Sequence, residues 1–152
     1  DFVMKGYWNR EEATEEALRG GLFHTGDAGY FDEDGFLYIH DRIKDMIVSG
    51  AENVYPAEVE NVLYDHPDIA EVAVIGVPDK KWGEAVKAIA VARPGHTIEA
   101  SSLIELCQGR LAKYKCPTSV DVVDALPRNA SGKVLKTELR EPYWAGQDRR
   151  IS

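Results

Sequence analysis

The feature that most constrains the fold is a pair of β-rich runs in the middle of the chain. These runs, EVAVIGV (71–77) and AVKAIAVA (85–92), are separated by a turn between Pro78 and Gly83. Short runs rich in valine and isoleucine, bounded by glycine and proline, are typical of strands. They predict two strands joined by a turn, around which the rest of a domain has to fold.

The segments around these runs supply helices, a further strand and a short hairpin. Pro56 suits the first turn of a helix, and SSLIELCQGRLAKY (101–114) carries its apolar residues on one helical face. From residue 56 onward the order is α-β-β-α-β, which predicts an α+β fold with helices packed on a small mixed β-sheet. The predicted elements are a hairpin around Gly50, helices over 56–65, 101–114 and 136–141, and a strand over 119–126.

The first 43 residues have a different pattern. The opening DFVMKGYWNR is strand-like, Thr14 is a candidate N-cap for a helix that ends at Gly20-Gly21, and the alternation on both sides of Gly35 predicts a hairpin. One helix and one hairpin are too little to bury a core. We therefore expect residues 1–43 to be the C-terminal edge of a larger N-terminal domain, and residues 44–152 to form a C-terminal domain of their own.

Composition narrows the possible functions. The formal net charge of −8 argues against a nucleic-acid binder, and no apolar run is long enough to span a membrane. The two cysteines, Cys107 and Cys116, stand nine residues apart, a spacing that excludes a zinc knuckle and does not favour a disulfide framework. We expect a cytoplasmic protein with no metal site in this chain.

The loop PRNASGK (127–133) ends in a lysine that directly follows a glycine. A phosphate-binding P-loop needs glycine at its first position and serine or threonine after the lysine, whereas Pro127 and Val134 stand there, so that interpretation is excluded. Turn-forming residues predict a mobile backbone, from which Lys133 could place its charge in a site built by another domain. A plain surface lysine explains the same residues, and residue chemistry alone leaves both open.

Polar residues beside two turns are further candidates. Asp27 lies just before a strand, where its carboxylate could accept hydrogen bonds from a ribose diol or cap the turn. Arg42 has a planar guanidinium suited to ribose or phosphate oxygens. Gly50 permits close approach of the backbone to a ligand, and Glu52 adds a polar side chain at the same hairpin. Turn chemistry explains each of these residues taken singly.

Six stretches together resemble one family. Their order and spacing are similar to the C-terminal part of the adenylate-forming (ANL) superfamily, which includes acyl-CoA synthetases, peptide-synthetase adenylation domains and luciferases. The residues in these motifs are most similar to those of fatty-acid and aryl-acid CoA ligases, and the match covers nearly the whole chain. The stretches are MKGYWNR (4–10), HTGD (24–27), DGFLYIHDRIKDMIVSGAENVYPAEVE (34–60), VAVIGVPDKKWGE (72–84), LAKYKCP (111–117) and LPRNASGK (126–133).

The resemblance implies an ATP-dependent acyl-CoA ligase with ATP and CoA as co-substrates. A carboxylic acid, with a fatty acid favoured, would react with ATP to give an acyl-adenylate and pyrophosphate, and CoA would then displace AMP. Asp27 and Arg42 are implied to bind the nucleotide. Lys133 is implied to reach the carboxylate and phosphate oxygens in the first step.

The resemblance also implies that residues 44–152 rotate between the two half-reactions. Lys44 occupies the hinge position, and an exposed lysine at a strand end is the alternative. Ala51 stands where many relatives have a second glycine, and a core tryptophan at a turn is an alternative for Trp82. The implied CoA contacts are Gly50, Ala51, Glu52, Trp82, Tyr114 and Lys115.

One departure affects the CoA phosphates. Cys116 and Thr118 lie where some aryl-CoA ligases carry basic residues. The lysines Lys80, Lys81 and Lys113 are candidates to replace them.

The rest of the family's machinery would lie upstream of Asp1. This includes the Gly-rich phosphate loop, the acidic ligand of Mg²⁺ and the acyl pocket, so the missing N-terminal domain would be the main partner. The 152 residues alone are therefore expected neither to adenylate an acid nor to bind ATP tightly. The alternatives are the adenylation domain of a peptide synthetase and a stand-alone, non-catalytic α+β binding module.

Overall fold

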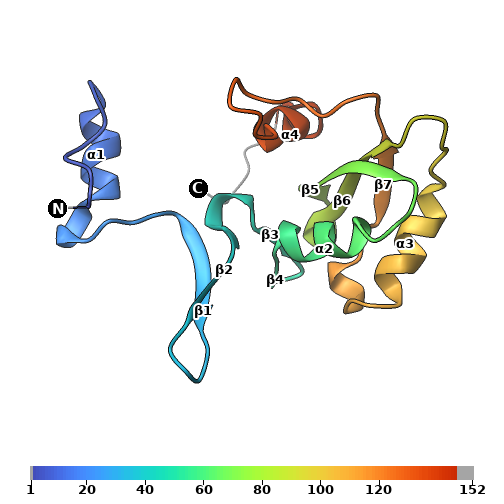
Figure 1. Cartoon of the computed structure of the whole chain (residues 1–152), viewed down its shortest axis with the longest axis horizontal. Helices are drawn as coiled ribbons and strands as arrows, with labels where there is room; N and C mark the ends of the chain where they lie inside the picture. Colours follow the sequence, from blue (N-terminus) through green and yellow to red (C-terminus); the bar gives the residue numbers. More distant parts are fainter. Residues whose placement is uncertain (1, 147–152) are drawn as a thin grey trace. The chain divides into compact units, whose positions relative to one another are not determined.

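The computed structural model describes residues 2–146 and divides the chain into two compact units, Asp1–Ile43 (unit 1) and Lys44–Ser152 (unit 2) (Figure 1). Each unit has its own hydrogen bonds and packing. None of the helices within residues 2–146 is both long and apolar enough to cross a membrane.

Unit 1 contains a short helix and a two-stranded hairpin. The predicted hairpin is confirmed, and its turn residue Gly35 has a φ of +84°, a conformation that favours glycine. The carboxylate of Asp32 closes this turn by accepting the backbone N–H groups of Asp34 and Phe36. The elements are α1 (Glu11–Ala17), the 3₁₀ turn η1 (Arg19–Gly21), β1 (Asp27–Phe31) and β2 (Leu37–Arg42).

The predicted N-cap of the first helix is wrong. Thr14 lies inside α1, where its hydroxyl donates to the Arg10 carbonyl at 2.8 Å and accepts the Tyr7 N–H at 2.9 Å. The helix begins at Glu11, with acidic residues in the first turn that interact favourably with the helix dipole. Thr14 therefore ties the preceding chain to the helix instead of starting it.

Two further predictions for unit 1 are wrong in detail. α1 ends at Ala17, because Gly20 and Gly21 both have positive φ and lie in the separate turn η1. The strand-like opening forms turns and bends over residues 2–10, since no strand of the described chain pairs with it.

Unit 2 contains a five-stranded sheet and the longer helices. α2 ends two residues earlier than predicted, and α3 ends at Gln108, where Gly109 caps it. Residues 113–115 form a separate 3₁₀ turn instead of continuing α3. The elements are η2 (Ile43–Asp45), β3 (Ile47–Ser49), β4 (Glu52–Val54), α2 (Pro56–Leu63), β5 (Ile69–Asp79), β6 (Gly83–Ala92), α3 (Ala100–Gln108), η3 (Lys113–Lys115), β7 (Ser119–Val122) and α4 (Lys136–Trp144).

Strand β6 lies at the centre of the sheet. It pairs antiparallel with β5 along its whole length and parallel with β7 over residues 87–90. At its start, Gly83 pairs with Ser49 of β3, and β3 pairs in turn with β4. The predicted α+β fold with a small mixed sheet is confirmed.

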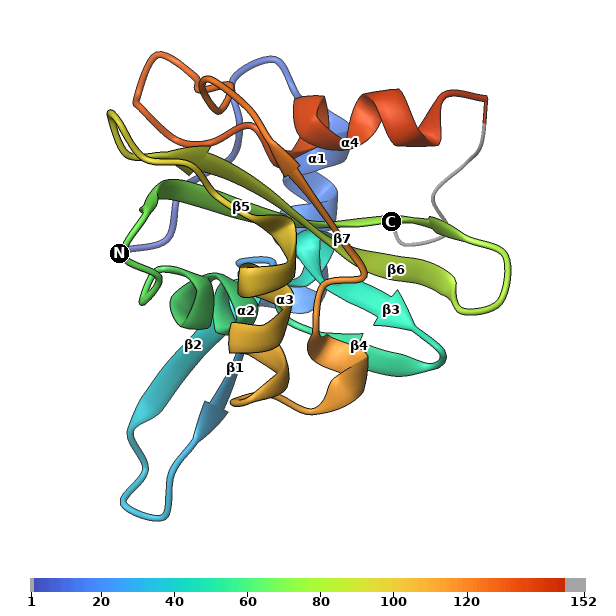
Figure 2. The same cartoon turned by 90° about the vertical axis from the view of Figure 1, so that its right-hand side faces the viewer.

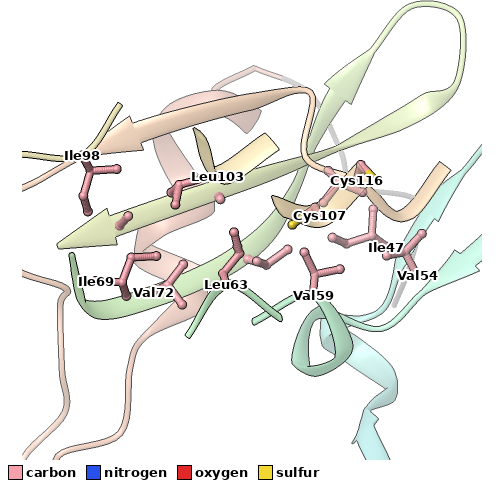
Figure 3. Packing of buried hydrophobic residues seen from close by; sticks show 14 residues of the cluster. Ile47, Val54, Val59, Leu63, Ile69, Val72, Ile98, Leu103, Cys107 and Cys116 are labelled. Carbon is pink, nitrogen blue, oxygen red and sulfur yellow. The ribbon is translucent and has the colours of Figure 1, made fainter. Parts of the chain in front are cut away.

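The two faces of the sheet bury two separate apolar clusters. α2 and α3 cover one face, and α4 lies on the other (Figure 2). Side chains of β5 alternate between them, because Val72 and Val74 belong to the first cluster and Ala73 and Ile75 to the second. Figure 3 shows the first cluster, with Ile47, Val54, Val59, Leu63, Ile69, Val72, Ile98, Leu103, Cys107 and Cys116 labelled.

Among residues 2–146, no strand pairs with the outer edge of β5, and side chains occupy hydrogen-bonding groups along it. The Tyr64 hydroxyl bonds both the N–H and the C=O of Val72 at 3.4 Å. The Glu60 carboxylate accepts the Val74 N–H at 2.7 Å. The indole of Trp144 donates to the Gly76 carbonyl at 3.0 Å. Helices α2 and α4 thus cap the strand from both faces of the sheet.

Candidate functional site

The loop that carries Lys133 is closed by its own side chains. The carboxamide oxygen of Asn129 accepts the N–H of Ser131 at 3.0 Å and the N–H of Lys133 at 2.9 Å, and Asn129 N–H bonds the Lys133 carbonyl at 3.0 Å. Gly132 completes the turn with a φ of +83°. The expected mobile backbone is therefore an internally bonded turn, because asparagine can imitate a backbone acceptor.

Ion pairs brace this loop on both sides. Arg128 pairs with Glu71 of β5 at 2.8 Å, and Lys136, the first residue of α4, pairs with Glu60 of α2 at 2.8 Å. Both side chains of the second pair are largely buried. Lys133 itself is exposed, and no side chain of residues 2–146 pairs with its ammonium group. A cation at the end of a braced loop is suited to an anionic ligand outside unit 2.

Asp27 and Arg42 lie together in unit 1. They are register partners across the β1–β2 hairpin, and Arg42 Nε lies 2.8 Å from Asp27 Oδ1. Arg42 Nη1 also donates to the Thr25 carbonyl at 3.4 Å. The pair is partly exposed, so its contribution to stability is about 0–1 kcal/mol. The second carboxylate oxygen of Asp27 is left for other hydrogen bonds.

Lys44 lies at the boundary between the two units. It is the middle residue of η2, and its side chain is exposed. It thus lies in a short 3₁₀ turn, after strand β2 has ended at Arg42.

The β3–β4 hairpin and Trp82 form one assembly. Gly50 N–H donates to the Trp82 carbonyl at 2.9 Å, and a Cβ on Gly50 would meet the Trp82 ring at 2.7 Å. Gly50 has a φ of +60° and Ala51 a φ of +69°, and Glu52 begins β4. A second glycine would relieve the strain at Ala51, which costs roughly 1–2 kcal/mol. Glycine at position 50 is therefore required by both conformation and space.

Trp82 is not a core residue. Its side chain is 49% exposed, and the ammonium of Lys81 lies 4.4 Å from the ring centroid. The alternative of a core tryptophan at a turn is wrong. An aromatic surface next to a lysine suits a ligand with apolar and anionic parts.

Tyr114 and Lys115 lie in η3, which packs against β4. The Lys115 ammonium bonds both oxygens of Glu58 at 2.7 Å, and this hydrogen bond raises the pKa of Lys115. Tyr114 is 42% exposed. Glu58 already offsets the charge of Lys115, so an anion there would have to compete with this carboxylate.

The structure groups the candidate residues of unit 2 at two places. The β3–β4 hairpin, Trp82 and η3 lie near one end, whereas the loop that carries Lys133 lies on the α4 side at the opposite end (Figures 1 and 2). Within residues 2–146, no group of three His, Cys, Asp or Glu side chains could hold a metal ion. Unit 2 therefore presents two separate candidate surfaces.

Sequence reasoning missed a partly buried polar network under α4. Lys87 in β6 pairs with Asp121 of β7 at 2.7 Å, and its ammonium lies 5.0 Å from the Tyr143 ring. Tyr143 donates a hydrogen bond to Asp121, and burial followed by this bond raises the pKa of Tyr143 to about 12. Burial opposes ionisation of Asp121, but the bonds from Lys87 and Tyr143 prevail and lower its pKa. The sequence does contain one sign of this network, because Lys87 interrupts the apolar run AVKAIAVA.

A second missed contact joins distant parts of unit 2. Arg140 of α4 pairs with Asp45 of η2 at 3.0 Å, and both side chains are nearly buried. The two residues stand 95 apart in the chain. Nothing local in the sequence marks this pair.

Comparisons with known proteins give the family. The AMP-binding enzyme C-terminal domain family matches residues 58–133, a segment that covers half of the chain. The long-chain-fatty-acid–CoA ligase FadD13 of Mycobacterium tuberculosis is 54% identical over 145 residues, which are 95% of this chain and 29% of that protein. The 2-succinylbenzoate–CoA ligase of Geobacillus kaustophilus is 54% identical over 138 residues, or 91% of this chain and 28% of that protein.

A solved structure agrees with these matches. The o-succinylbenzoate CoA synthetase of Bacillus subtilis, in complex with its acyl-adenylate intermediate, superposes with a TM-score of 0.84 at 47% identity and covers 99% of this chain and 29% of that one. The chain thus spans less than a third of the length of these relatives. On these matches, the chain belongs to the AMP-binding enzyme C-terminal domain family.

Proposed function

We propose that this chain is the C-terminal part of an AMP-forming acyl-CoA ligase. Such an enzyme activates a carboxylic acid as its acyl-adenylate and then transfers the acyl group to CoA. The observation that carries the proposal is the exposed Lys133 on a braced loop, at the opposite end of unit 2 from the Gly50–Trp82 assembly. The similarity to a long-chain-fatty-acid–CoA ligase supports a fatty acid as the substrate.

In the first half-reaction a substrate carboxylate attacks the α-phosphorus of ATP, and the bond to pyrophosphate breaks. Two anions approach each other in this step, so negative charge accumulates between them. The ammonium of Lys133 is proposed to lie against both anions. A preorganised charge of this kind is worth roughly 10²–10³ in rate, by analogy with an oxyanion-hole donor.

Asp27 and Arg42 are proposed to bind the nucleotide. Arg42 engages one carboxylate oxygen of Asp27, which fixes the carboxylate on the hairpin and leaves the other oxygen to accept hydrogen bonds from ribose hydroxyls. The remaining N–H groups of the Arg42 guanidinium can reach ribose or phosphate oxygens.

In the second half-reaction the CoA thiol attacks the acyl carbonyl, and AMP leaves with the bonding electrons. We assign the pantetheine arm to Gly50, Ala51 and Glu52, because these residues form an exposed tight turn next to Trp82. Trp82 is proposed to pack against the same ligand. Tyr114 and Lys115 are proposed to lie near its nucleotide end, and Lys80, Lys81 and Lys113 are proposed as the basic residues for the CoA phosphates.

The separation of the two candidate surfaces of unit 2 explains why the proposed enzyme would need a hinge. Because the Lys133 loop and the Gly50 hairpin lie at opposite ends of unit 2, a single placement of this unit serves one half-reaction. Rotation about Lys44 is proposed to exchange them, as in other hinge-type switches. Unit 1 is proposed to be the edge of the larger domain against which unit 2 moves.

The parts of the site that this chain lacks are proposed to lie in the remainder of a longer protein. They are the phosphate loop, the acyl pocket and the ligands of Mg²⁺. In support, the relatives are more than three times as long as the matched segment. We expect no pyrophosphate release from the 152 residues alone, and turnover by the isolated chain would contradict the assignment.

The decisive test is Lys133→Ala in the longer protein. Adenylation, measured by pyrophosphate release, should fall by roughly 10²–10³, whereas thioester formation from supplied acyl-adenylate should stay near wild type. Arg110→Ala, at an arginine in an exposed pair with Asp65, is the control and should leave both steps unchanged. Equal loss of both steps in Lys133→Ala would contradict the role of this lysine.

A further inference from the structure

Hydrogen bonds fix the chain on both sides of the boundary between the two units. On one side, the N–H of Ile43 donates to the Gly26 carbonyl of unit 1 at 2.8 Å. On the other side, Asp45 Oδ1 accepts from Arg140 Nη1 of unit 2 at 3.0 Å. Lys44 stands between these two attachments, as the middle residue of the 3₁₀ turn η2.

Arg140 is itself held in place by a well-anchored helix. It is one of three charged residues of the described chain that are buried, with Glu84 and Lys87. Its neighbours Leu139 and Tyr143 pack against the second apolar cluster, and Trp144 bonds the edge of β5. The guanidinium thus reaches η2 from a rigid support, and loss of either partner would leave a nearly buried charge without compensation.

We propose that the Asp45–Arg140 pair confines the pivot to the backbone of Lys44 and makes Arg140 a positioning residue for both half-reactions. This inference rests on the proposed function. Without the pair, the bend could spread over Asp45 and Met46, and unit 2 would reach each of its two orientations less accurately. Since α4 begins three residues after Lys133, the same helix links the pivot to the loop that delivers the charge.

The first test measures backbone order in the 152-residue chain by ¹⁵N relaxation. In Arg140→Met, the order parameters of Asp45 and Met46 should fall from about 0.85 to below about 0.6, whereas those of Leu139 and Val86 should not change. Arg110→Met removes an arginine from an exposed ion pair and should have no effect at these positions. Unchanged order at Asp45 and Met46 in Arg140→Met would overturn the inference.

A second variant covers the case in which Arg140→Met does not fold. Asp45→Ala cuts the same link from the side of the turn and leaves α4 intact. It should produce the same loss of order at Met46. A folded Asp45→Ala with wild-type order there would equally overturn the inference.

The second test uses the longer protein and both half-reactions. Arg140→Met should lower kcat of adenylation and of thioester formation by about tenfold or more, with little change in KM, because misplacement of about 1 Å can cost that much. Arg140→Lys, which keeps the charge, should recover most of both rates. Wild-type rates in Arg140→Met, despite lost order at Asp45, would show that Arg140 is not a positioning residue.

The two proposals fail separately. If Lys133→Ala keeps full adenylation, the proposed function is wrong, while the relaxation result for Arg140→Met still stands by itself. If Lys133→Ala behaves as expected and Arg140→Met changes neither order nor rates, only the proposed role of the Asp45–Arg140 pair is wrong.

Discussion

The two units of this chain use apolar residues in opposite ways. Unit 2 packs a sheet between helices. Its two apolar clusters consist of buried side chains, the first of them in the chain being Ile47 and the last Leu126. None of residues 2–43 is buried, although Trp8, Phe31 and Leu37 are large and apolar. Backbone ladders and turn bonds set the local shape of unit 1, and an isolated hairpin of this kind is marginal in water. The helix and hairpin of unit 1 therefore form without a buried core, whereas a stable fold such as that of unit 2 requires one.

Separating the units should give the largest effect. Residues 44–152 alone should unfold in one cooperative transition, because they contain both apolar clusters. Residues 1–43 alone should show no cooperative transition and little chemical-shift dispersion. Circular dichroism melts and ¹H–¹⁵N spectra of both pieces check this. A cooperative melt of 1–43 would break the comparison.

A matched pair of leucine substitutions should give the next largest effect. Leu103→Ala in the first cluster should cost about 3–5 kcal/mol, from lost transfer energy and the cavity left behind. Leu37→Ala, at a side chain that is 56% exposed, should cost less than about 0.5 kcal/mol. Urea unfolding of the 152-residue chain measures both. Similar costs would mean that unit 1 contributes a core of its own.

Two glycines of unit 2 separate backbone strain from crowding. Gly50 and Gly95 both have positive φ, but a Cβ would meet the Trp82 ring at 2.7 Å at Gly50 and nothing within 4 Å at Gly95. Gly95→Ala should cost about 1 kcal/mol from strain alone, and Gly50→Ala about 1–3 kcal/mol more because Trp82 has to move. Denaturant unfolding of the 152-residue chain checks this. Equal costs would show that Trp82 yields freely.

The smallest effect should appear only at alkaline pH. Because burial and the bond to Asp121 raise the pKa of Tyr143 from 10.0 to about 12, the folded state keeps a proton that the unfolded state loses. Its contribution is complete below pH 10 and is lost as the pH rises to about 12. Tyr143→Phe should therefore show a flatter loss of stability over this window.

Patterns close together in the sequence predicted much of this structure. The paired runs of β5 and β6 were clear because both faces are covered, so apolar residues follow one another without a polar alternation. Gly35 and Gly50 marked their hairpins through their freedom to adopt positive φ. The start of the first helix was not predictable from Thr14, since its hydroxyl bonds backward to Arg10 instead of capping.

Some features of the candidate site were likewise predictable from local sequence, and others were not. Lys133, Trp82 and the Gly50 hairpin were recognisable as motifs, whereas the closure of the loop by Asn129 needed the turn itself. The pair Asp45–Arg140 and the network around Lys87 join segments that are distant in the chain. Charge pairs of this kind depend on which helix lies over which strand, and no local pattern contains that information.

The covered edge of β5 has a consequence for how unit 2 behaves among other protein chains. An open strand edge invites other chains to add a strand. Tyr64, Glu60 and Trp144 occupy the outward-facing groups of β5 that would otherwise accept such a strand. The covered edge therefore protects unit 2 from adding a strand of another chain and becoming a template for aggregation.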